Sequence, residues 1–351
     1  MNGRICLRAV LTAAAGLLLL AGAPAHAAHV QCGDTLTTST TLDGDVLCAD
    51  DYQPYGLRIA ADNVLLRMNG YALRAGLGGG GVGISSSSPD ADGLQGVRIK
   101  RGSIEGFLAG VDLAPIDDST IFKVNVTTNA FDSQELGDAG ILLTGHRNRV
   151  EQSGVSLLAP FGDPGIRLAG NDVYAWGNVV AAGGDESSGG HSGVVAIGER
   201  PRLVYNRVAC SPLGQLSVAG VSASGYTEYA VVNRNLTQDC TEGVVAQAAV
   251  AAGAGGGRVA LNHTAGGNVG IRVQDGSATV NRNIAEEASD TGILLSLAGT
   301  FVRANAAHNN GSYGIYGPEG TVDGGGNVAG GNGDGTNPQC VNVSCSPPPP
   351  P

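Results

Sequence analysis

Several features are missing from this chain of 351 residues, and each absence excludes a class of protein. There is no Cys-x-x-Cys pair and no Cys/His cluster with metal-ligand spacing, which argues against a structural zinc site. Glycine is abundant, at 57 residues, but shows no Gly-X-Y period, so the chain is not a collagen. Aromatic residues make up only 4%, yet 42% of residues are apolar and recur in order, which argues against disorder.

Long hydrophobic runs are also absent, apart from one at the N-terminus. Arg4 and Arg8 precede this run, which ends at the small-residue site Ala25-His26-Ala27. The pattern predicts a signal peptide over residues 1–27 and a secreted or periplasmic protein. A membrane anchor is the alternative, but the run has about half of the ~20 residues that a span needs. We therefore expect no membrane span in the mature chain.

Positive charge is scarce as well. The formal net charge is −11, lysine occurs only at Lys100 and Lys123, and export would remove Arg4 and Arg8. Because an acidic surface repels phosphate backbones, nucleic acid is not an expected partner.

Six cysteines remain after the predicted cleavage, an even number that indicates disulfides in an exported protein. Proximity in sequence favours the pairs Cys32–Cys48, Cys210–Cys240 and Cys340–Cys345, although the sequence leaves the connectivity open.

An internal repeat runs from residue 56 to residue 327. A glycine followed by a short alternating apolar run recurs at intervals of 22 to 30 residues. The glycines are Gly56, Gly83, Gly110, Gly140, Gly165, Gly193, Gly220, Gly243, Gly270, Gly292 and Gly314. Asparagine stands thirteen positions later in seven rows, as Asn69, Asn178, Asn206, Asn233, Asn283, Asn305 and Asn327.

Units of this length, rich in Val and Ile and punctuated by Gly and Asn, are typical of short strands and tight turns. Three such strands make one turn of a coil, and successive coils stack about 4.8 Å apart. We expect inward side chains to form one continuous core and the asparagines to bond one another as a ladder. The outward position two residues after each glycine would form a column from Arg58 to Tyr316.

The rows, such as "VGIRVQDGSATVNRNIAE", and the opening "CGDTLTTSTTLDGDVLC" resemble the right-handed parallel β-helix repeats of secreted bacterial proteins with the pectin-lyase-like fold. The resemblance covers about residues 30 to 345. It implies an all-β solenoid of about eleven coils over residues 56–327, with disulfide-linked caps at 28–55 and 328–345 and a Pro-rich tail at 346–351. Lyases, hydrolases, epimerases and adhesins share this fold, so it does not fix an activity.

Catalytic candidates stand two positions before three consecutive glycines: Asp138, Asp163 and His191. On adjacent coils they would lie about 5 Å apart. Two carboxylates at that separation favour one raised pKa, and therefore a general acid beside a base or nucleophile. Aspartate before glycine is also ordinary turn chemistry, so a structural role is the competing interpretation.

Substrate-binding candidates are Arg167, which we expect to point outward beside Asp163, and the pair Tyr174 and Trp176 as a sugar platform. A lone tryptophan can equally pack under a turn. The surrounding acidic residues could bind Ca²⁺, or could be the solvated face of an acidic protein. No cofactor is required by any motif.

The function predicted from these features is an exported protein that binds polysaccharide or plays a structural role. The alternative is a lyase or glycoside hydrolase acting on acidic polysaccharide. The Asp-Pro-His signature of alginate epimerases is missing, because Asp163-Pro164 is followed by Gly165. Lysine is so scarce that the base of a lyase would have to be an arginine.

Overall fold

The computed structural model describes residues 29–49, 54–76, 80–87, 93–128, 139–157, 164–182, 192–210, 219–225, 229–248, 256–274, 277–335 and 337–349. Within these ranges all regular structure is β-strand, and no helix is long and apolar enough to cross a membrane.

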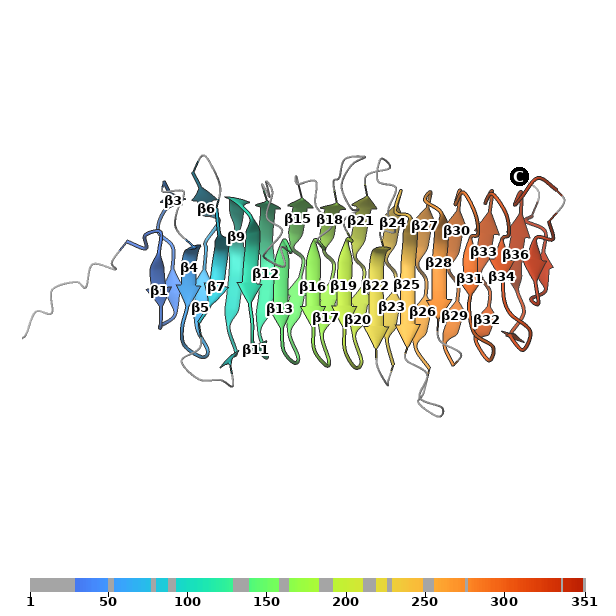
Figure 1. Cartoon of the computed structure of the whole chain (residues 1–351), viewed down its shortest axis with the longest axis horizontal. Helices are drawn as coiled ribbons and strands as arrows, with labels where there is room; N and C mark the ends of the chain where they lie inside the picture. The colour runs from blue at the N-terminus through green and yellow to red at the C-terminus, as the bar shows by residue number, and fades with distance from the viewer. Residues whose placement is uncertain are drawn as a thin grey trace, which may run out of the picture.

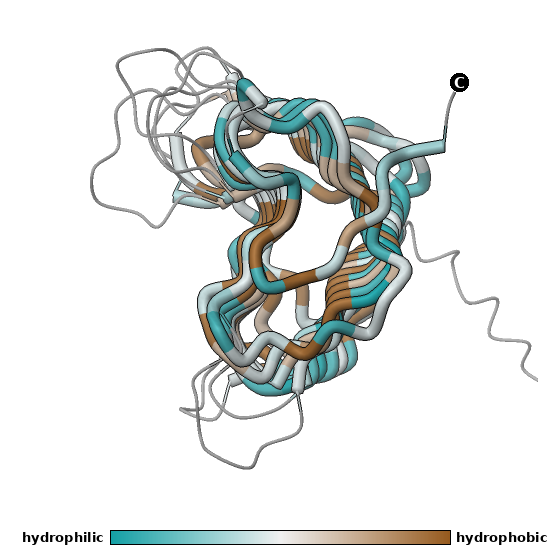
Figure 2. The backbone as a smooth tube through the Cα atoms, turned by 90° about the vertical axis from the view of Figure 1, so that its right-hand side faces the viewer, coloured by the Kyte–Doolittle hydropathy of each residue, from teal (hydrophilic) through white to brown (hydrophobic). Residues whose placement is uncertain are grey.

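The chain winds into a right-handed parallel β-helix, seen from the side in Figure 1 and end-on in Figure 2. Each complete coil contributes one strand to each of three faces, and each strand pairs in parallel with its counterpart in the next coil. Apolar residues recur at the same place in successive coils (Figure 2), and their buried side chains form the core.

The first face is a sheet of thirteen described strands. They are β1 (Asp34–Leu36), β4 (Tyr55–Ile59), β7 (Val82–Ser86), β10 (Ala109–Leu113), β13 (Ile141–Thr144), β16 (Ile166–Ala169), β19 (Val194–Ile197), β22 (Ala219–Gly225), β25 (Glu242–Ala248), β28 (Val269–Gln274), β31 (Ile293–Leu295), β34 (Ile315–Tyr316) and β37 (Cys340–Val341).

The second face carries the strand that follows in each coil. Its strands are β2 (Thr40–Thr41), β5 (Leu65–Arg67), the start of β9 (Arg98–Phe107), the start of β12 (Thr120–Thr128), β14 (Arg149–Glu151), β17 (Tyr174–Trp176), β20 (Arg202–Val204), β23 (Val231–Asn233), β26 (Arg258–Ala260), β29 (Thr279–Asn281), β32 (Phe301–Arg303) and β35 (Val322–Asp323).

The third face completes the coil and continues the long strands β9 and β12. Its other strands are β3 (Val46–Cys48), β6 (Ala72–Ala75), β15 (Gly154–Leu157), β18 (Val179–Ala182), β21 (Arg207–Cys210), β24 (Leu236–Gln238), β27 (His263–Ala265), β30 (Ile284–Glu286), β33 (Ala306–His308), β36 (Asn327–Gly330) and β38 (Cys345–Ser346). A short pair, β8 (Leu94–Gln95) and β11 (Ile116–Asp117), lies between the first and second faces.

The glycine rows are the strands of the first face, in register. The residue after each glycine is buried and pairs with its equivalent in the next coil, as Val111 does with Ile141 and Ile141 with Ile166. The predicted outward column is confirmed along the whole face, from Arg58 opposite Ser85 to Leu294 opposite Tyr316. Strands β1 and β37, from the segments expected to act as caps, add a rung at each end.

Close packing explains why glycine leads each row. A Cβ on Gly193 would lie 2.3 Å from Val208 Cγ1 and 2.4 Å from the Gly220 carbonyl oxygen. The other central glycines of the column meet the next glycine's carbonyl in the same way. Glycine is therefore required by the approach of one coil to the next.

The asparagine ladder forms at the corner between the second and third faces. Asn206 Oδ1 accepts hydrogen bonds from the backbone N–H of Asn178, at 3.2 Å, and from its Nδ2, at 2.9 Å. Asn178 Nδ2 also donates to the Val150 carbonyl at 2.9 Å. The pattern repeats through buried asparagines, which are Asn178, Asn206, Asn235, Asn262, Asn283, Asn305 and Asn327.

The predicted asparagine column is thus confirmed at five positions and wrong at two. Asn69 lies in a turn with a φ of 56°, and Asn233 belongs to β23. Asn235 and Asn262 occupy the ladder positions instead. They stand 15 and 19 positions after Gly220 and Gly243, because longer turns separate them from their glycines.

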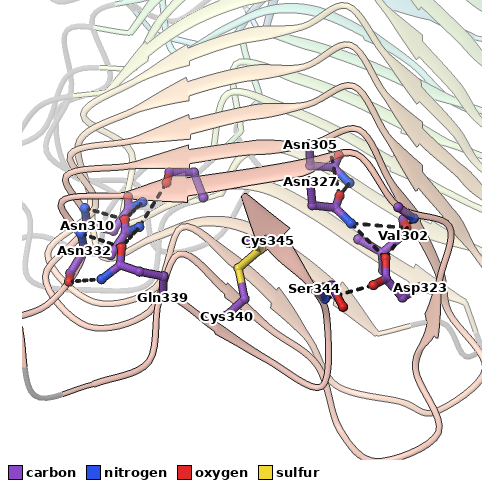
Figure 3. Close-up of a disulfide and its surroundings, with 12 residues drawn as sticks. Val302, Asn305, Asn310, Asp323, Asn327, Asn332, Gln339, Cys340, Ser344 and Cys345 are labelled. Atoms are coloured by element: carbon purple, nitrogen blue, oxygen red, sulfur yellow. Dashed lines mark hydrogen bonds between the residues drawn. A yellow bond between two sulfur atoms is a disulfide. The ribbon is translucent and has the colours of Figure 1, made fainter. Parts of the chain in front are cut away.

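All three disulfide pairs are confirmed. Cys32–Cys48 lies in the first coil and Cys340–Cys345 in the last, while Cys210–Cys240 joins two neighbouring coils of the third face. Figure 3 shows how the last coil ends: the bridge lies between two capped corners. At one corner Asn327 Nδ2 donates to Asp323 Oδ1 at 3.1 Å, and at the other Asn332 Nδ2 donates to Gln339 Oε1 at 2.8 Å.

Candidate binding groove

The structure places the predicted site residues in three groups. Asp138, Asp163 and His191 lie outside the described residues. Arg167 is exposed on β16 of the first face. Tyr174 and Trp176 both point outward from β17, on the second face, so the arginine and the aromatic pair are on different faces.

The Ca²⁺ prediction also concerns residues outside the described part of the chain. Within the described ranges, no group of three or more His, Cys, Asp or Glu side chains is arranged to hold a metal ion. The calcium site therefore stays a prediction.

Tyr174 lies in a groove of about 860 Å³ that crosses five coils of the second face. At about 4.8 Å per coil, the groove is roughly 20 Å long. Its lining residues are Asp118, Thr120, Arg147, Arg149, Asp172, Tyr174, Arg200, Arg202, Tyr229 and Val231.

One edge of the groove is formed by the turn that leads into the second face. Asp118, Arg147, Asp172 and Arg200 all have φ between 51° and 58°, the left-handed conformation that lets each coil turn sharply. Because every coil turns in the same way, these side chains stack in one column.

The column alternates in charge and pairs internally. The Arg147 guanidinium holds both carboxylate oxygens of Asp118, with Nε to Oδ1 at 2.6 Å and Nη2 to Oδ2 at 2.7 Å. Arg200 holds Asp172 in the same bidentate way, at 2.7 Å for both bonds. A bidentate pair fixes the orientation of the guanidinium plane relative to the carboxylate plane, so this edge of the groove is preorganised.

The floor of the groove centres on Tyr174. Arg149 precedes it and Arg202 follows it in the same outward column. Both guanidinium carbons lie 5.8 Å from the centre of the tyrosine ring. Two cations at this distance interact with the ring electrons and flank its exposed part. Trp176, two residues along the strand, also faces outward but does not line the groove.

The protonation states in the groove follow from these contacts. The hydrogen bonds from Arg147 lower the pKa of the Asp118 carboxyl, with burial working against them, and those from Arg200 do the same for the pKa of Asp172. Burial raises the pKa of the Tyr174 phenol, against the effect of Arg202. At neutral pH both aspartates are ionised and the tyrosine is neutral.

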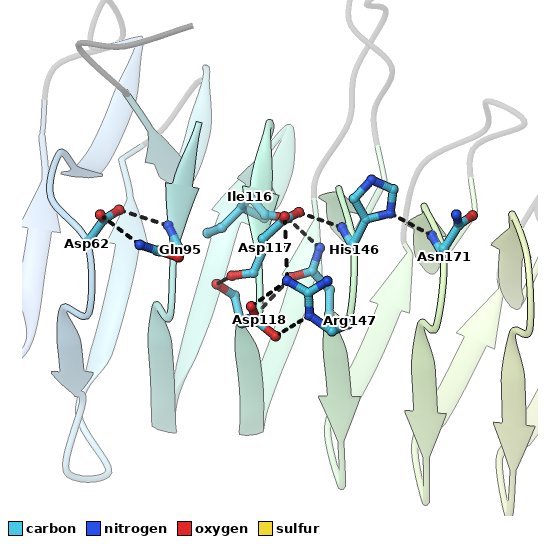
Figure 4. A network of polar contacts seen from close by, with 10 residues as sticks. Asp62, Gln95, Ile116, Asp117, Asp118, His146, Arg147 and Asn171 are labelled. Atoms are coloured by element: carbon cyan, nitrogen blue, oxygen red, sulfur yellow. Dashed lines mark hydrogen bonds and ion pairs between the residues drawn. The ribbon is translucent and has the colours of Figure 1, made fainter. Parts of the chain in front are cut away.

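A second polar column runs beside the first, as Figure 4 shows. The backbone N–H of His146 donates to Asp117 Oδ1 at 2.6 Å, and His146 Nδ1 accepts from the backbone N–H of Asn171 at 3.1 Å. An acceptor at Nδ1 places the proton of the neutral ring on Nε2. Arg147 links the columns through its bonds to Asp118 and a 3.8 Å contact with Asp117.

The sequence contains a signal for this groove. Arg147, Asp172 and Arg200 each stand seven positions after their glycine, and Arg149, Tyr174 and Arg202 stand nine positions after it. Reading these two offsets down the repeat would have revealed the column of paired charges and the flanked tyrosine.

Comparison with known proteins supports no family assignment. No protein-family model and no curated protein matches the sequence. The A-module of a mannuronan C-5 epimerase from Azotobacter vinelandii is 14% identical, with a TM-score of 0.49 over 91% of this chain and 89% of that one.

Two other solved structures resemble the coil. The catalytic unit of a GH87 alpha-1,3-glucanase from Streptomyces thermodiastaticus is 14% identical, with a TM-score of 0.42 over 85% of this chain and 62% of that one. The Dettilon tailspike protein is 13% identical, with a TM-score of 0.37 over 90% of this chain and 60% of that one. What the groove binds has to be inferred from its own side chains.

Proposed function

We propose that this protein is an exported binding protein for acidic polysaccharide, and that the groove around Tyr174 holds the sugar. The observation that carries the proposal is the neutral tyrosine ring between Arg149 and Arg202 in a preorganised groove.

The charge of the groove supports an anionic ligand. Four arginines and two aspartates line it, which leaves an excess of positive charge in a chain whose net charge is −11. Arg147 and Arg200 each hold one aspartate, and Arg149 lies 3.8 Å from Glu151 Oε1, so Arg202 is the groove arginine with no carboxylate within 4.0 Å among the described residues. A planar guanidinium binds a carboxylate with two parallel hydrogen bonds, which suits a uronic acid.

The shape of the groove supports a sugar. A pyranose ring has an apolar face of C–H groups, which can stack on the exposed part of the Tyr174 ring while its carboxylate reaches a flanking arginine. The groove crosses five coils of the second face, so a linear polymer has room to continue over neighbouring coils.

The groove favours binding over turnover. A general acid or base should have a pKa near the working pH. Here the pKa of Asp118 and Asp172 is lowered and the pKa of Tyr174 is raised, which moves all three away from neutrality. The lyase or hydrolase alternative rests on Asp138, Asp163 and His191, outside the described residues, and stays a prediction, as does the signal peptide at 1–27.

The test is a binding titration that uses Trp176, the single tryptophan, as an intrinsic fluorescent probe beside the groove. Short oligogalacturonates and oligomannuronates would be titrated into the disulfide-bonded protein, with a neutral cello-oligosaccharide as comparison. Tyr174→Ala should weaken uronate binding roughly tenfold, since it removes both the stacking surface and the ring between the arginines.

Tyr205→Ala is the matched control. Tyr205 is also exposed and lies under an arginine, 5.1 Å from Arg234, but does not line the groove. Equal weakening in both variants, or tighter binding of the neutral sugar than of the uronates, would rule out the proposed site. The same mixtures would be assayed for new reducing ends, and their appearance would favour the enzymatic alternative.

A further inference from the structure

A group of cations lies next to the groove, on the coils nearer the N-terminus. It consists of Arg67 on β5, Arg98, Lys100 and Arg101 on β9, and Lys123 on β12. We call these five residues the basic stripe. The two lysines in it are the only lysines of the chain.

Strand register brings these residues together. Arg67 pairs with Lys100, which pairs in turn with Phe122. Arg101 and Lys123 follow in the adjoining turn, both with left-handed φ, of 58° and 55°. Arg67, Arg98, Arg101 and Lys123 are exposed, and Lys100 is partly exposed.

Within the described ranges, the cations of the stripe have no acidic partners. Some arginines elsewhere do pair with carboxylates, as Arg74 does with Asp45 and Glu105 at 3.1 and 3.0 Å. Among the described residues, no carboxylate lies within 4.0 Å of any cation of the stripe. Unpaired like charges on adjacent strands repel one another, a cost that an anionic ligand would relieve.

The stripe is continuous with the groove. Arg98 pairs directly with Thr120, and Thr120 pairs with Arg149. Thr120 and Arg149 line the groove. Arg98 therefore extends the outward column of Arg149 and Tyr174 by one coil. Arg67 and Lys100 belong to the neighbouring outward column, which continues through Phe122 and Glu151 to Trp176. Lys123 lies 5.1 Å from the Phe122 ring, which adds a second aromatic surface beside a cation, after Tyr174.

We infer that the basic stripe is an extended subsite for a polyanionic chain that runs parallel to the coil axis, from the groove at Tyr174 toward β5. The inference rests on the proposed function and names its ligand more closely: a long uronan, with many carboxylates in a row, rather than a single acidic sugar. The ligand would be held by stacking in the groove and by charge along the stripe.

A uronan fits the stripe better than a nucleic acid does. Duplex DNA carries a negative charge about every 1.7 Å, and the acidic remainder of this chain repels that density. A uronan has one carboxylate per ring, and each of the three coils of the stripe supplies at least one cation, at a coil spacing of about 4.8 Å.

The test is the dependence of affinity on ligand length. Short and long oligogalacturonates would be titrated into the wild type and an Arg98→Ala, Lys100→Ala double variant at low and moderate salt. For the wild type we expect tighter binding of the long ligand. The double variant should bind the long ligand roughly three- to tenfold more weakly, with a smaller salt dependence, and the short ligand as the wild type does.

The matched control is Arg282→Ala, Arg303→Ala. These exposed arginines occupy the same outward columns in coils far from the groove, on the C-terminal side. Equal losses in control and stripe variants, an unchanged length dependence, or tighter binding of a single-stranded oligonucleotide than of the uronan would overturn the inference. Loss of short-ligand binding in Tyr174→Ala is a separate result, which tests the groove itself.

Discussion

Asn233 and Asn235 are two positions apart and have opposite environments. Asn235 is buried in the ladder, where its Oδ1 accepts from the backbone N–H and Nδ2 of Asn206 at 2.9 and 3.0 Å. Asn233 is half-buried on β23, outside the ladder, and its Oδ1 has no hydrogen-bond partner. Substituting each residue in turn therefore distinguishes the contribution of the ladder bonds to stability from the contribution of an asparagine outside the ladder.

We expect Asn235→Ala to lower the free energy of unfolding by about 2–4 kcal/mol, because it leaves two buried donors of Asn206 and the Leu203 carbonyl without partners. Asn233→Ala should change it by less than about 0.5 kcal/mol. Urea unfolding followed by far-UV circular dichroism measures both. Equal losses would mean that the ladder bonds contribute nothing beyond local packing.

Counting positions from the glycine of each row predicts the location of some residues and not of others. Positions close to the glycine, such as Arg58 and Tyr316 two residues on, were placed correctly, because a strand keeps strict alternation. Asn235 and Asn262 were missed because turns of variable length intervene. Asp118 stands eight positions after its glycine and Arg147 seven, so their bidentate pair needs the structure to establish it.

At the scale of elements, the first face depends on contact between coils more than on any single strand. Its strands are as short as two residues, and none would be stable alone. They are held because glycine lets each coil lie directly against its neighbour. The sequence predicted these strands well, since the glycine and the apolar residue after it recur in every row of the repeat.

Gly193→Ala tests this contact. The added methyl group would overlap Val208 and the Gly220 carbonyl, and we expect a loss of roughly 1–3 kcal/mol in the free energy of unfolding. Gly44→Ala is the control, because its methyl group would meet only the His29 ring, at 3.3 Å. Thermal unfolding of the two variants should give a clearly lower midpoint for Gly193→Ala alone. Matching midpoints would mean that the coils can move apart at little cost.

At the scale of the whole molecule, the two ends of the solenoid differ in chemistry. The N-terminal coils carry unpaired cations on the second face, and the C-terminal end places Asp323 under the ladder. Asp323 is exposed, and the partial desolvation of its carboxyl works to raise its pKa. Hydrogen bonds from the backbone N–H groups of Ser344 and Gly325 and from the Ser344 and Asn327 side chains outweigh this effect and lower the pKa. The last coil is therefore attached through an ionised group.

This arrangement predicts acid sensitivity at the C-terminal end. A carboxyl whose pKa is lower in the folded state than its usual 3.8 stabilises the fold above that value, and the stabilisation is lost as the pH falls through the folded pKa. The protection factors of the Val328 and Ser344 amides, which compare each exchange rate with the intrinsic rate at the same pH, should thus fall below about pH 4. Asp323→Asn should reduce this pH dependence, whereas Glu319→Gln, at an exposed neighbouring position, should keep it. An unchanged pH dependence in Asp323→Asn would mean that another titrating group causes the acid sensitivity.

The asparagine ladder also gives the molecule a direction. In every rung Nδ2 donates toward the C-terminal end and Oδ1 accepts from the N-terminal side, from Asn178 to Asn327. The side-chain amide dipoles therefore add head to tail, as peptide dipoles do along an α-helix. The positive end of this array meets the Asp323 carboxylate, in the relation of an acidic residue to a helix N-terminus. The described part of the solenoid contains no helix, yet its stacked side-chain amides form an aligned dipole like the one that backbone peptides form along a helix.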